Sequence, residues 1–144
     1  MTDVAWKLKC VECGREYDGL ELRYRCECTG TLNVEHDFTV HKELSTGMFD
    51  ARLRSKEALD RSGVWRFREL VLPLDTEHVI SRAEGNTNLY RSSMLASYTG
   101  LDDVYLKHEG ENPTGSFKDR GMTTGISLAR KLGMTRVAVA STGN

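Results

Sequence analysis

The four cysteines of this chain form two close pairs near its amino end, and they constrain its folding more than any other feature. The pairs are Cys10-x2-Cys13 and, a dozen residues later, Cys26-x-Cys28. This spacing is typical of a tetrahedral Zn²⁺ site, because each pair turns in a tight knuckle and the segment between them brings the knuckles together. Since four cysteines leave no coordination position open, we expect a structural rather than a catalytic zinc ion.

The residues around the cysteines predict a zinc ribbon over residues 1–34. Leu20–Arg25 alternates apolar and polar side chains, as a strand does, and Thr31–Val34 can be its partner. Gly14 and Gly30 follow the two cysteine pairs, where we expect turns with positive φ. A unit of this size cannot bury enough apolar surface to fold alone, so metal binding would supply the missing stability.

Two disulfides or four unrelated thiols are the alternative interpretations of the cysteines. Met1 leads directly to Thr2-Asp3 without a signal peptide, which indicates a cytoplasmic protein and disfavours disulfides. Positive and negative side chains are equal in number over residues 6–34, and the whole chain has a net charge of −1. Because a nucleic-acid surface needs an excess of basic residues, we expect no nucleic-acid partner.

Composition and patterning predict a globular α/β protein. Hydrophobic residues make up 39% of the chain and charged residues 28%, and no apolar run approaches the length that spans a membrane. We therefore expect no membrane partner. Residues 35–78 are predicted to be a connecting segment that contains helix, within Ser55–Val71, where Gly63 interrupts the pattern. Residues 79–144 are predicted to begin a catalytic domain.

The pattern of residues 79–144 predicts alternating helices and strands. Ser92–Tyr98 is predicted to be a short helix that ends at Gly100, and Val104–His108 to be a strand. A longer helix follows, and Arg136–Ala140 is predicted to be the next strand. A strand, a helix and a strand of these lengths predict a parallel βαβ unit.

The segment Asn112–Met122 is a turn that runs directly into a helix and carries a lysine in the first helical turn. Pro113 and Gly115 predict the turn, and Thr114 or Ser116 can cap the helix. The helix is predicted over Phe117–Leu132. One face of this helix is expected to be buried, and it consists of Phe117, Gly121, Gly125, Leu128 and Leu132. The two glycines on this buried stripe would let the helix backbone lie close to a neighbouring sheet.

Lys118 therefore lies among unpaired amides at the positive end of a helix dipole. An ordinary lysine is almost entirely ammonium at neutral pH, with a pKa of about 10.4. The dipole contributes less than one pKa unit, so desolvation would have to lower the pKa enough for the amine to react with an aldehyde cofactor. A solvated surface lysine is one alternative. A nucleotide-binding loop is another, but Lys118 comes two residues too late after Gly110 and Gly115 for that motif.

Three segments in order resemble the motifs of the threonine synthases, pyridoxal-phosphate enzymes of the tryptophan-synthase-like fold, also called fold type II. Asn112–Met122 is similar to the motif that holds the cofactor lysine. Ala83–Leu89 resembles the family's G-E-G-N-T-P-L motif, with Asn88 in place of the proline. Ser141–Asn144 resembles the start of the S-T-G-N-T loop.

The resemblance implies a role for several residues. Lys118 would bind pyridoxal 5'-phosphate covalently and then move protons on the substrate. Asn144 would hydrogen-bond the 3′-hydroxyl of the cofactor ring, and Ser141 and Thr142 would receive the substrate carboxylate. Amino-terminal ribbons with similar cysteine pairs also occur in this family, which agrees with Cys10, Cys13, Cys26 and Cys28 as ligands of structural Zn²⁺.

The reaction implied by the resemblance converts O-phospho-L-homoserine, a small amino-acid phosphate, and water to L-threonine and phosphate. This is a lyase reaction and the last step of threonine biosynthesis. Another enzyme of the same fold, such as a threonine or serine dehydratase or a cysteate synthase, would share the chemistry and differ in substrate. A non-catalytic zinc-ribbon interaction protein is the alternative from a different class.

Enzymes of this family are more than twice as long as the present chain, which stops within the third motif. We therefore expect a fragment that is truncated before the glycine-rich loop for the cofactor phosphate. It would contain only the amino-terminal part of the catalytic domain. We expect such a fragment to be inactive alone. The candidate protein partners are further copies of the chain, in a homo-oligomer, and a missing carboxy-terminal portion.

Overall fold

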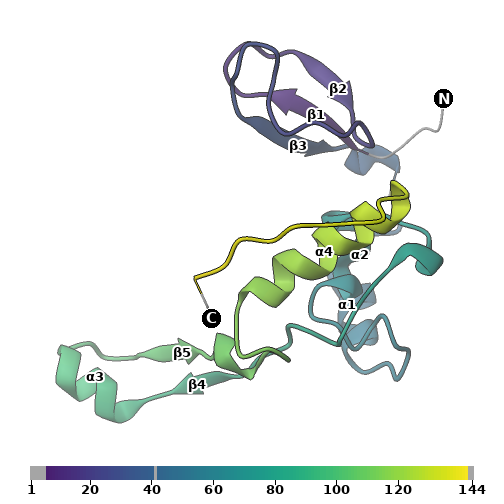
Figure 1. Cartoon of the computed structure of the whole chain (residues 1–144). Helices are drawn as coiled ribbons and strands as arrows, with labels where there is room; N and C mark the ends of the chain where they lie inside the picture. Colours follow the sequence, from purple (N-terminus) through teal and green to yellow (C-terminus); the bar gives the residue numbers. More distant parts are fainter. Residues whose placement is uncertain (1–5, 41, 143–144) are drawn as a thin grey trace. The chain divides into compact units, whose positions relative to one another are not determined.

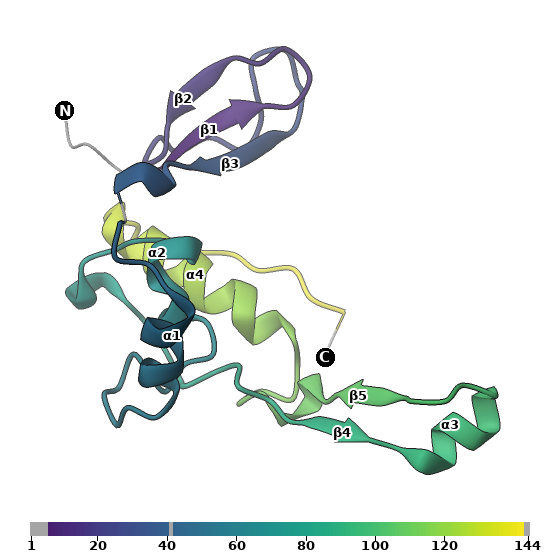
Figure 2. The same cartoon turned by 180° about the vertical axis from the view of Figure 1, so that it is seen from behind.

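The computed structural model describes residues 6–40 and 42–142, and it divides into two units, Met1–Thr46 and Gly47–Asn144. Figure 1 and, from behind, Figure 2 show their helices and strands. No helix among the described residues is long and apolar enough to cross a membrane.

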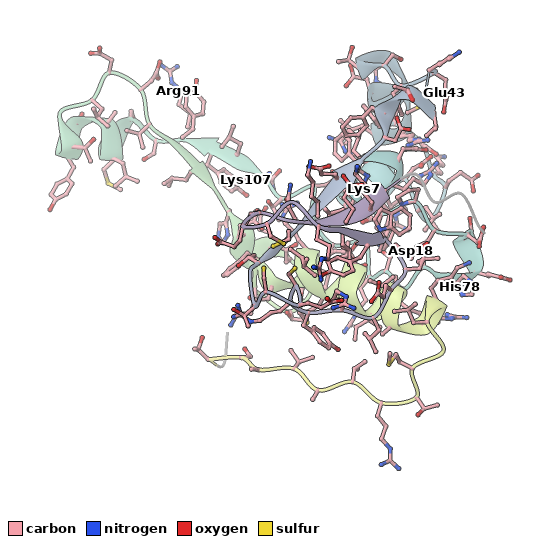
Figure 3. All side chains as sticks on the ribbon, turned by 90° about the horizontal axis from the view of Figure 1, so that it is seen from above. Lys7, Asp18, Glu43, His78, Arg91 and Lys107 are labelled. Carbon is pink, nitrogen blue, oxygen red and sulfur yellow. The ribbon has the colours of Figure 1, made fainter. Side chains whose placement is uncertain are left out.

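A three-stranded antiparallel sheet forms the first unit. It consists of β1 (Trp6–Cys10), β2 (Glu16–Asp18) and β3 (Leu32–His36) in the order β2-β1-β3, followed by a 3₁₀ turn at Phe38–Val40. Lys7 on β1 lies opposite Asp18 on β2, and both are labelled in Figure 3. The sheet holds Cys10 at the end of its central strand.

The predicted strand at Leu20–Arg25 is wrong. These residues form turns and irregular backbone, and Tyr24 is 86% exposed. The partner of the segment near Thr31–Val34 is β1, which pairs Leu8 with Val34 and Cys10 with Leu32. Because β1 already has a neighbour on each edge, an alternating segment elsewhere has no place in this sheet. β1 was not predicted, although Trp6–Cys10 alternates apolar and charged side chains as a strand does.

Backbone geometry at the two knuckles agrees only in part with the prediction. Gly14 has φ +73°, as expected, but at the second knuckle the positive φ belongs to Thr29, with φ 70°. Gly30 is required for a different reason, because no side chain fits at its position. A Cβ atom there would lie 2.5 Å from Cγ of Glu12 and 2.8 Å from Sγ of Cys10.

The second unit contains helices and one hairpin. The helices are α1 (Thr46–Leu53), α2 (Arg68–Val71), α3 (Ser93–Thr99) and α4 (Lys118–Lys131), with 3₁₀ turns at Trp65–Phe67, Thr76–His78 and Glu109–Glu111. The predicted helix within Ser55–Val71 is confined to residues 65–71. Gly63 lies just before it, at the interruption that the sequence indicated.

The hairpin pairs β4 (Leu89–Arg91) with β5 (Tyr105–Lys107), and α3 lies between the two strands in sequence. Figure 3 shows Arg91 toward the α3 end of this hairpin and Lys107 at the opposite end. The predicted end of α3 at Gly100 is confirmed, with φ 72°, whereas Ser92, predicted as the first helical residue, is the N-cap, and its hydroxyl accepts from the backbone of Leu95.

The predicted parallel βαβ unit does not form among the described residues, whose two sheets are both antiparallel. Arg136–Ala140 has no regular secondary structure, and Val137 and Val139 are 55% and 58% exposed. A strand exists only through hydrogen bonds to a neighbour, and no described residue provides that neighbour.

The predicted helix at Phe117–Leu132 is confirmed within one residue at each end, but the predicted buried stripe is wrong. Gly121 and Gly125 face open space. The residues of α4 that are buried are Thr123 and Ser127. Their hydroxyls bind the backbone of Ile80: Ser127 Oγ accepts from Ile80 N at 2.8 Å, and Thr123 Oγ1 donates to Ile80 O at 2.5 Å.

Trp65 is the centre of the apolar core of this unit. It is fully buried, and its indole Nε1 donates to Thr123 Oγ1 at 2.7 Å. This bond joins residues that are 58 positions apart and anchors the segment before α2 to α4.

Two glycines bring distant segments of this unit into contact. Gly63 N donates to Glu84 O at 2.7 Å. A Cβ atom on Gly63 would overlap the backbone nitrogen of Asn86 and lie 2.8 Å from Cα of Gly85. No side chain fits between these two backbones.

We expect Gly63→Ala to lower the free energy of unfolding by about 1–3 kcal/mol, the usual cost of overpacking, because the clash is with backbone. Gly121→Ala is the matched control. It adds the same methyl group in open space on α4 and should leave stability unchanged or raise it by up to about 1 kcal/mol. Urea unfolding followed by Trp65 fluorescence, in a Trp6→Phe background, measures both. Equal urea midpoints for Gly63→Ala and Gly121→Ala would contradict the close approach of Gly63 to the backbone of Gly85 and Asn86.

Candidate active site and candidate metal centre

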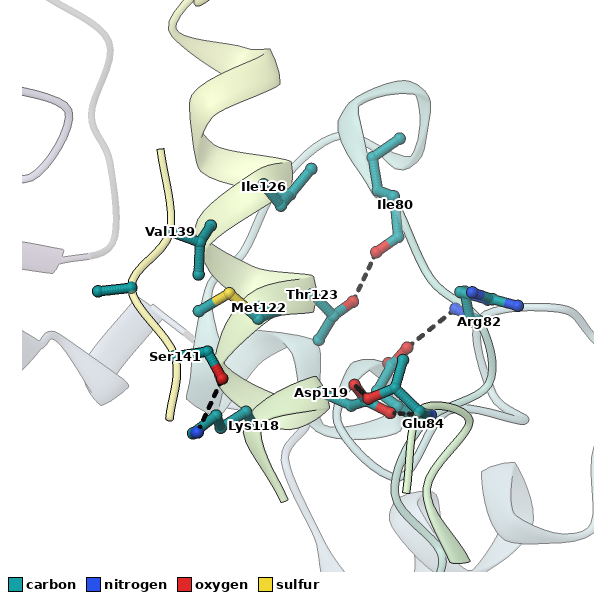
Figure 4. Close-up of a pocket in the computed structure, with 12 residues that line it drawn as sticks. Ile80, Arg82, Glu84, Lys118, Asp119, Met122, Thr123, Ile126, Val139 and Ser141 are labelled. Atoms are coloured by element: carbon teal, nitrogen blue, oxygen red, sulfur yellow. Dashed lines mark hydrogen bonds between the residues drawn. The ribbon is translucent and has the colours of Figure 1, made fainter. Parts of the chain in front are cut away.

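A cavity of about 430 Å³ lies in the second unit between α4 and the segment that contains Ile80 and Glu84 (Figure 4). Its wall is mostly apolar and carries a few polar and charged groups. The lining residues are Ile80, Arg82, Glu84, Thr114, Lys118, Asp119, Met122, Thr123, Ile126, Val139, Ala140 and Ser141. This combination is common in sites that bind small molecules.

Lys118 reaches this cavity because a tight turn precedes its helix. Gly115 has φ +73° and its N–H donates to Asn112 O at 2.8 Å, which closes the turn. The Ser116 hydroxyl then accepts from the Lys118 backbone at 3.2 Å. Phe117 is the residue that begins the helix and it provides no side-chain cap, so the predicted cap at Thr114 or Ser116 is wrong in detail.

The structure brings three of the predicted site residues together. Lys118 Nζ donates to Ser141 Oγ at 3.0 Å and to Thr142 Oγ1 at 3.3 Å (Figure 4 draws the first of these bonds). Each hydroxyl accepts this bond and keeps its own proton for another acceptor. The fourth predicted residue, Asn144, lies outside the described residues.

Lys118 is half-buried by the described residues rather than enclosed. The side chains around it that exclude water are Met122 of α4 and Val139 and Ala140 of the segment beside it. The strong desolvation expected of a neutral amine is therefore not supplied by these residues alone. A bound ring that fills the cavity would displace water from the amine.

Both carboxylates in the cavity wall are occupied by internal donors. Glu84 is 2% exposed and accepts from the hydroxyls of Ser62 and Ser81 and from the backbone of Arg82. The carboxylate of Asp119 accepts from the backbone and hydroxyl of Thr114, at 2.8 and 2.5 Å. Asp119 thus ties the turn at Thr114 to the start of α4.

Arg82 and Lys118 are the cations of the cavity wall. Within residues 6–40 and 42–142, the guanidinium of Arg82 makes no hydrogen bond or ion pair. With Glu84 and Asp119 engaged by donors, the cavity suits an anionic small molecule.

A second polar network fixes the turn before Lys118 to the segment at residues 83–89. Asn112 is buried, and its Oδ1 accepts from Gly85 N at 2.8 Å while its Nδ2 donates to Glu109 at 3.0 Å. Glu109 in turn binds Arg120 through two bonds of 2.7 and 2.8 Å and accepts from the Thr87 hydroxyl. The Arg120 guanidinium lowers the pKa of Glu109 to about 2.

Glu109 and Ser62 were not predicted from the sequence. Glu109 lies in a turn, 11 residues from Arg120, and no short-range pattern indicates their pairing. Ser62 is likewise 22 residues from Glu84.

Asn88, which replaces the family's proline, has a structural function here. Its backbone N–H donates to Glu111 Oε2 at 2.7 Å, and its side-chain amide donates to Glu111 Oε1 at 3.1 Å. Proline has no N–H and could not make the first bond. The Tyr90 hydroxyl also donates to Glu111 and lowers the pKa of that carboxyl to about 2. The turn is held by hydrogen bonds where a proline ring would restrict it.

The four cysteines converge in the first unit, as their spacing predicts. All four are free thiols, so the alternative of two disulfides does not apply. Their sulfur atoms lie within 4.8 Å of one another, with 3.6 Å between Cys10 and Cys28 and 3.5 Å between Cys13 and Cys26. Sulfurs around a tetrahedral zinc ion with bonds of about 2.3 Å are roughly 3.8 Å apart, so the cluster fits such an ion.

The two buried sulfurs of the cluster are Cys10 and Cys26, and the two exposed ones are Cys13 and Cys28. The Tyr17 hydroxyl lies 3.0 Å from Cys26 Sγ and lowers the pKa of that thiol to about 6. Thiolates are the form that binds a metal ion.

Comparison with known proteins supports the predicted resemblance. Residues 80–144 match the family model of the pyridoxal-phosphate dependent enzymes. Threonine synthase of Methanocaldococcus jannaschii is 43% identical over 136 residues, which are 94% of this chain and 32% of the relative. Threonine synthase of Methanosarcina acetivorans is 45% identical over 140 residues, again 32% of the relative. The chloroplastic threonine synthase 2 of Arabidopsis thaliana is 36% identical over 86% of this chain and 26% of its own length.

The chain therefore spans about a third of the length of the first two curated relatives, as the 32% coverage shows. The similarity runs through both units, because it covers 94–96% of the chain. The predicted resemblance to threonine synthases is confirmed.

The Glu109–Arg120 pair predicts how stability depends on pH. Since the pKa of Glu109 is about 2 in the folded chain and that of an unfolded glutamate is about 4.3, the pair stabilises the fold above pH 4.3 and this contribution is lost as the pH falls toward 2. Glu109→Gln should unfold more easily at neutral pH, by about 1.5–3 kcal/mol, and should lose less stability on acidification. Urea midpoints from pH 7 to pH 2 measure this.

The matched control is Glu57→Gln, which neutralises an exposed carboxylate of the same unit. It should keep the acid dependence of the unaltered chain. If Glu109→Gln and the unaltered chain showed parallel pH curves, the ion pair would not hold the turn.

Proposed function

We propose that this chain, whose residues 80–144 match the family model of the pyridoxal-phosphate dependent enzymes, is part of a threonine synthase. The whole protein would convert O-phospho-L-homoserine and water to L-threonine and phosphate. The observation that carries the proposal is the meeting of Lys118 and Ser141 in the wall of one cavity, with Thr142 bound to the same amine, because the two segments involved each resemble a motif of these enzymes.

The residues of the cavity fit pyridoxal phosphate. A volume of about 430 Å³ with walls of Ile80, Met122 and Ile126 can hold an aromatic ring, and Lys118 Nζ enters from one side. When bound, this cofactor supplies an electron sink for a carbanion on the substrate. Lys118 would hold the cofactor covalently, and Asn144 would bind its ring hydroxyl.

Each polar group of the wall then has a task. Once released from the cofactor, the Lys118 amine can accept and return a proton at the substrate's carbon atoms. The hydroxyls of Ser141 and Thr142 keep protons that can be donated to the substrate carboxylate. Arg82 and Lys118 make the cavity attractive to a substrate that carries both a carboxylate and a phosphate.

The rigid turn before α4 keeps the amine in place during these steps. Asn112, Glu109 and Arg120 fix the turn through hydrogen bonds on both of its sides. A reacting amine must stay close to its target, because a small displacement costs a large part of the rate. This network would therefore act through Lys118 and not on the substrate.

We also propose that Cys10, Cys13, Cys26 and Cys28 hold one structural Zn²⁺. The sulfur separations of 3.5 and 3.6 Å and the four free thiols support this proposal. The sheet of the first unit is small, and apart from Trp6 its buried apolar residues are cysteines. A metal ion would supply the stability that such a core lacks.

Lys118→Ala tests the enzymatic proposal. Borohydride reduction in the presence of pyridoxal phosphate should label the peptide that contains Lys118, and the variant should lose the label. Release of phosphate from phosphohomoserine by the whole enzyme should fall by about 10²–10⁴-fold or more, the range for loss of a general acid–base group. Lys131→Ala, on the same helix but paired with Asp75, should keep label and turnover. A label on another lysine would contradict the assignment.

Chelation and reconstitution test the zinc proposal. The chain should hold one zinc ion, detected by native mass spectrometry, and its removal should unfold the first unit, since metal binding contributes about 10–16 kcal/mol in small zinc peptides. Cys10→Ser should weaken binding strongly, whereas Val11→Ala, an exposed neighbour in the same knuckle, should not. A first unit that keeps its amide NMR spectrum after chelation would refute a structural metal.

A further inference from the structure

Tyr17 lies on β2, a strand of the first unit that carries no cysteine, and its hydroxyl reaches the cysteine cluster. Tyr17 Oη is 3.0 Å from Cys26 Sγ. The same oxygen is 3.3 Å from the backbone nitrogen of Glu27, the residue between the cysteines of the second pair. One hydroxyl thus contacts the second knuckle at two adjacent residues.

The direction of these two hydrogen bonds follows from the groups involved. A backbone N–H only donates, so Glu27 donates and the Tyr17 oxygen accepts. Arg15 is also within hydrogen-bond reach of this oxygen, and a guanidinium can only donate. A metal-bound Cys26 thiolate carries no proton, so in the contact between Tyr17 and Cys26 the hydroxyl would donate and the sulfur accept.

The ring of Tyr17 is held as well as its hydroxyl. The guanidinium carbon of Arg23 lies 4.1 Å from the ring centroid, and Arg23 is itself bound to Glu21 at 2.7 Å. Beside the ring, Arg15 forms an ion pair with Glu27. These contacts restrict the orientation from which the hydroxyl donates.

We propose that Tyr17 is a positioning residue of the metal site, which donates a hydrogen bond to the metal-bound Cys26 sulfur. This inference rests on the proposed zinc site and extends it to a residue that is not a ligand. Zinc with four thiolates carries a net charge of −2, so a donor to sulfur stabilises the centre. Cys26 is 4% exposed, and water has little access to replace this donor.

The contrast with the exposed ligands gives the proposal its specificity. Cys13 and Cys28 reach solvent and can accept hydrogen bonds from water. Cys26 is buried and has less access to water, and Tyr17 is its side-chain hydroxyl donor beside the backbone N–H of Cys28. Loss of the hydroxyl should therefore change the reactivity of the Cys26 sulfur more than that of the exposed cysteines.

Tyr17→Phe removes the hydroxyl and keeps the ring. We expect zinc affinity to fall about 10–100-fold, the usual effect of losing an outer-shell partner of a metal ligand. In the cobalt-substituted chain, the sulfur-to-cobalt charge-transfer band should move to lower energy, because a sulfur without its hydrogen bond is easier to oxidise. Alkylation of the zinc-loaded chain, mapped by mass spectrometry, should become faster at Cys26. A packing role alone would not move the charge-transfer band.

Tyr24→Phe is the matched control, since Tyr24 belongs to the same unit and is 86% exposed. It should match the unaltered chain in affinity, spectrum and alkylation. If Tyr17→Phe does not fold, 3-fluorotyrosine at position 17 keeps the hydroxyl and makes it a stronger donor. The charge-transfer band should then move to higher energy.

The outcomes separate this inference from the zinc proposal. An unaltered chain that binds neither zinc nor cobalt overturns both. Binding by the unaltered chain, with Tyr17→Phe indistinguishable from Tyr24→Phe or with no shift for fluorotyrosine, overturns the role of Tyr17 alone. A lower affinity with a shifted band, in a Tyr17→Phe chain whose amide NMR spectrum is otherwise retained, supports it.

Discussion

The hydrogen bonds from the hydroxyls of α4 to the backbone of Ile80 hold the second unit together around its cavity. Thr123 and Ser127 lie on the buried side of α4, and Trp65 completes this contact through Thr123. An apolar stripe could slide along its neighbour, because apolar contacts are not directional. Hydrogen bonds fix the rotation of the helix about its axis, and with it the direction in which Lys118 points. The position of the amine therefore depends on residues one and two turns further along the helix.

The charge that the cavity presents to a ligand depends on which of its polar groups already have hydrogen-bond partners. Glu84 and Asp119 line it as carboxylates, yet each is engaged by donors of its own segment, so they stabilise turns and leave the cations to face a ligand. Glu109 and Arg120 neutralise each other just outside the wall. A substrate with two anionic groups would enter such a site without meeting an unpaired carboxylate among the described residues of the wall.

Each unit contains one candidate site, and in each a residue outside the candidate reactive groups holds the site in place. In the second unit, Asn112 fixes the turn that presents Lys118. In the first unit, Tyr17 reaches from a neighbouring strand to a cysteine of the cluster. In both cases one polar side chain binds a backbone group and a functional segment at the same time. These paired hydrogen bonds restrict the geometry of the site.

The sequence by itself determined the features that depend on neighbouring residues. These are the end of α3 at Gly100, the turn at Gly115, the extent of α4 and the convergence of the cysteine pairs, because capping, positive φ and ligand spacing act over a few residues. Only the tertiary structure decided which face of α4 is buried, which strand pairs with β3, and which partners Glu84 and Glu109 have. Those outcomes depend on contacts between segments 11 to 58 residues apart, and no local pattern in a single sequence records which distant donor will meet which acceptor.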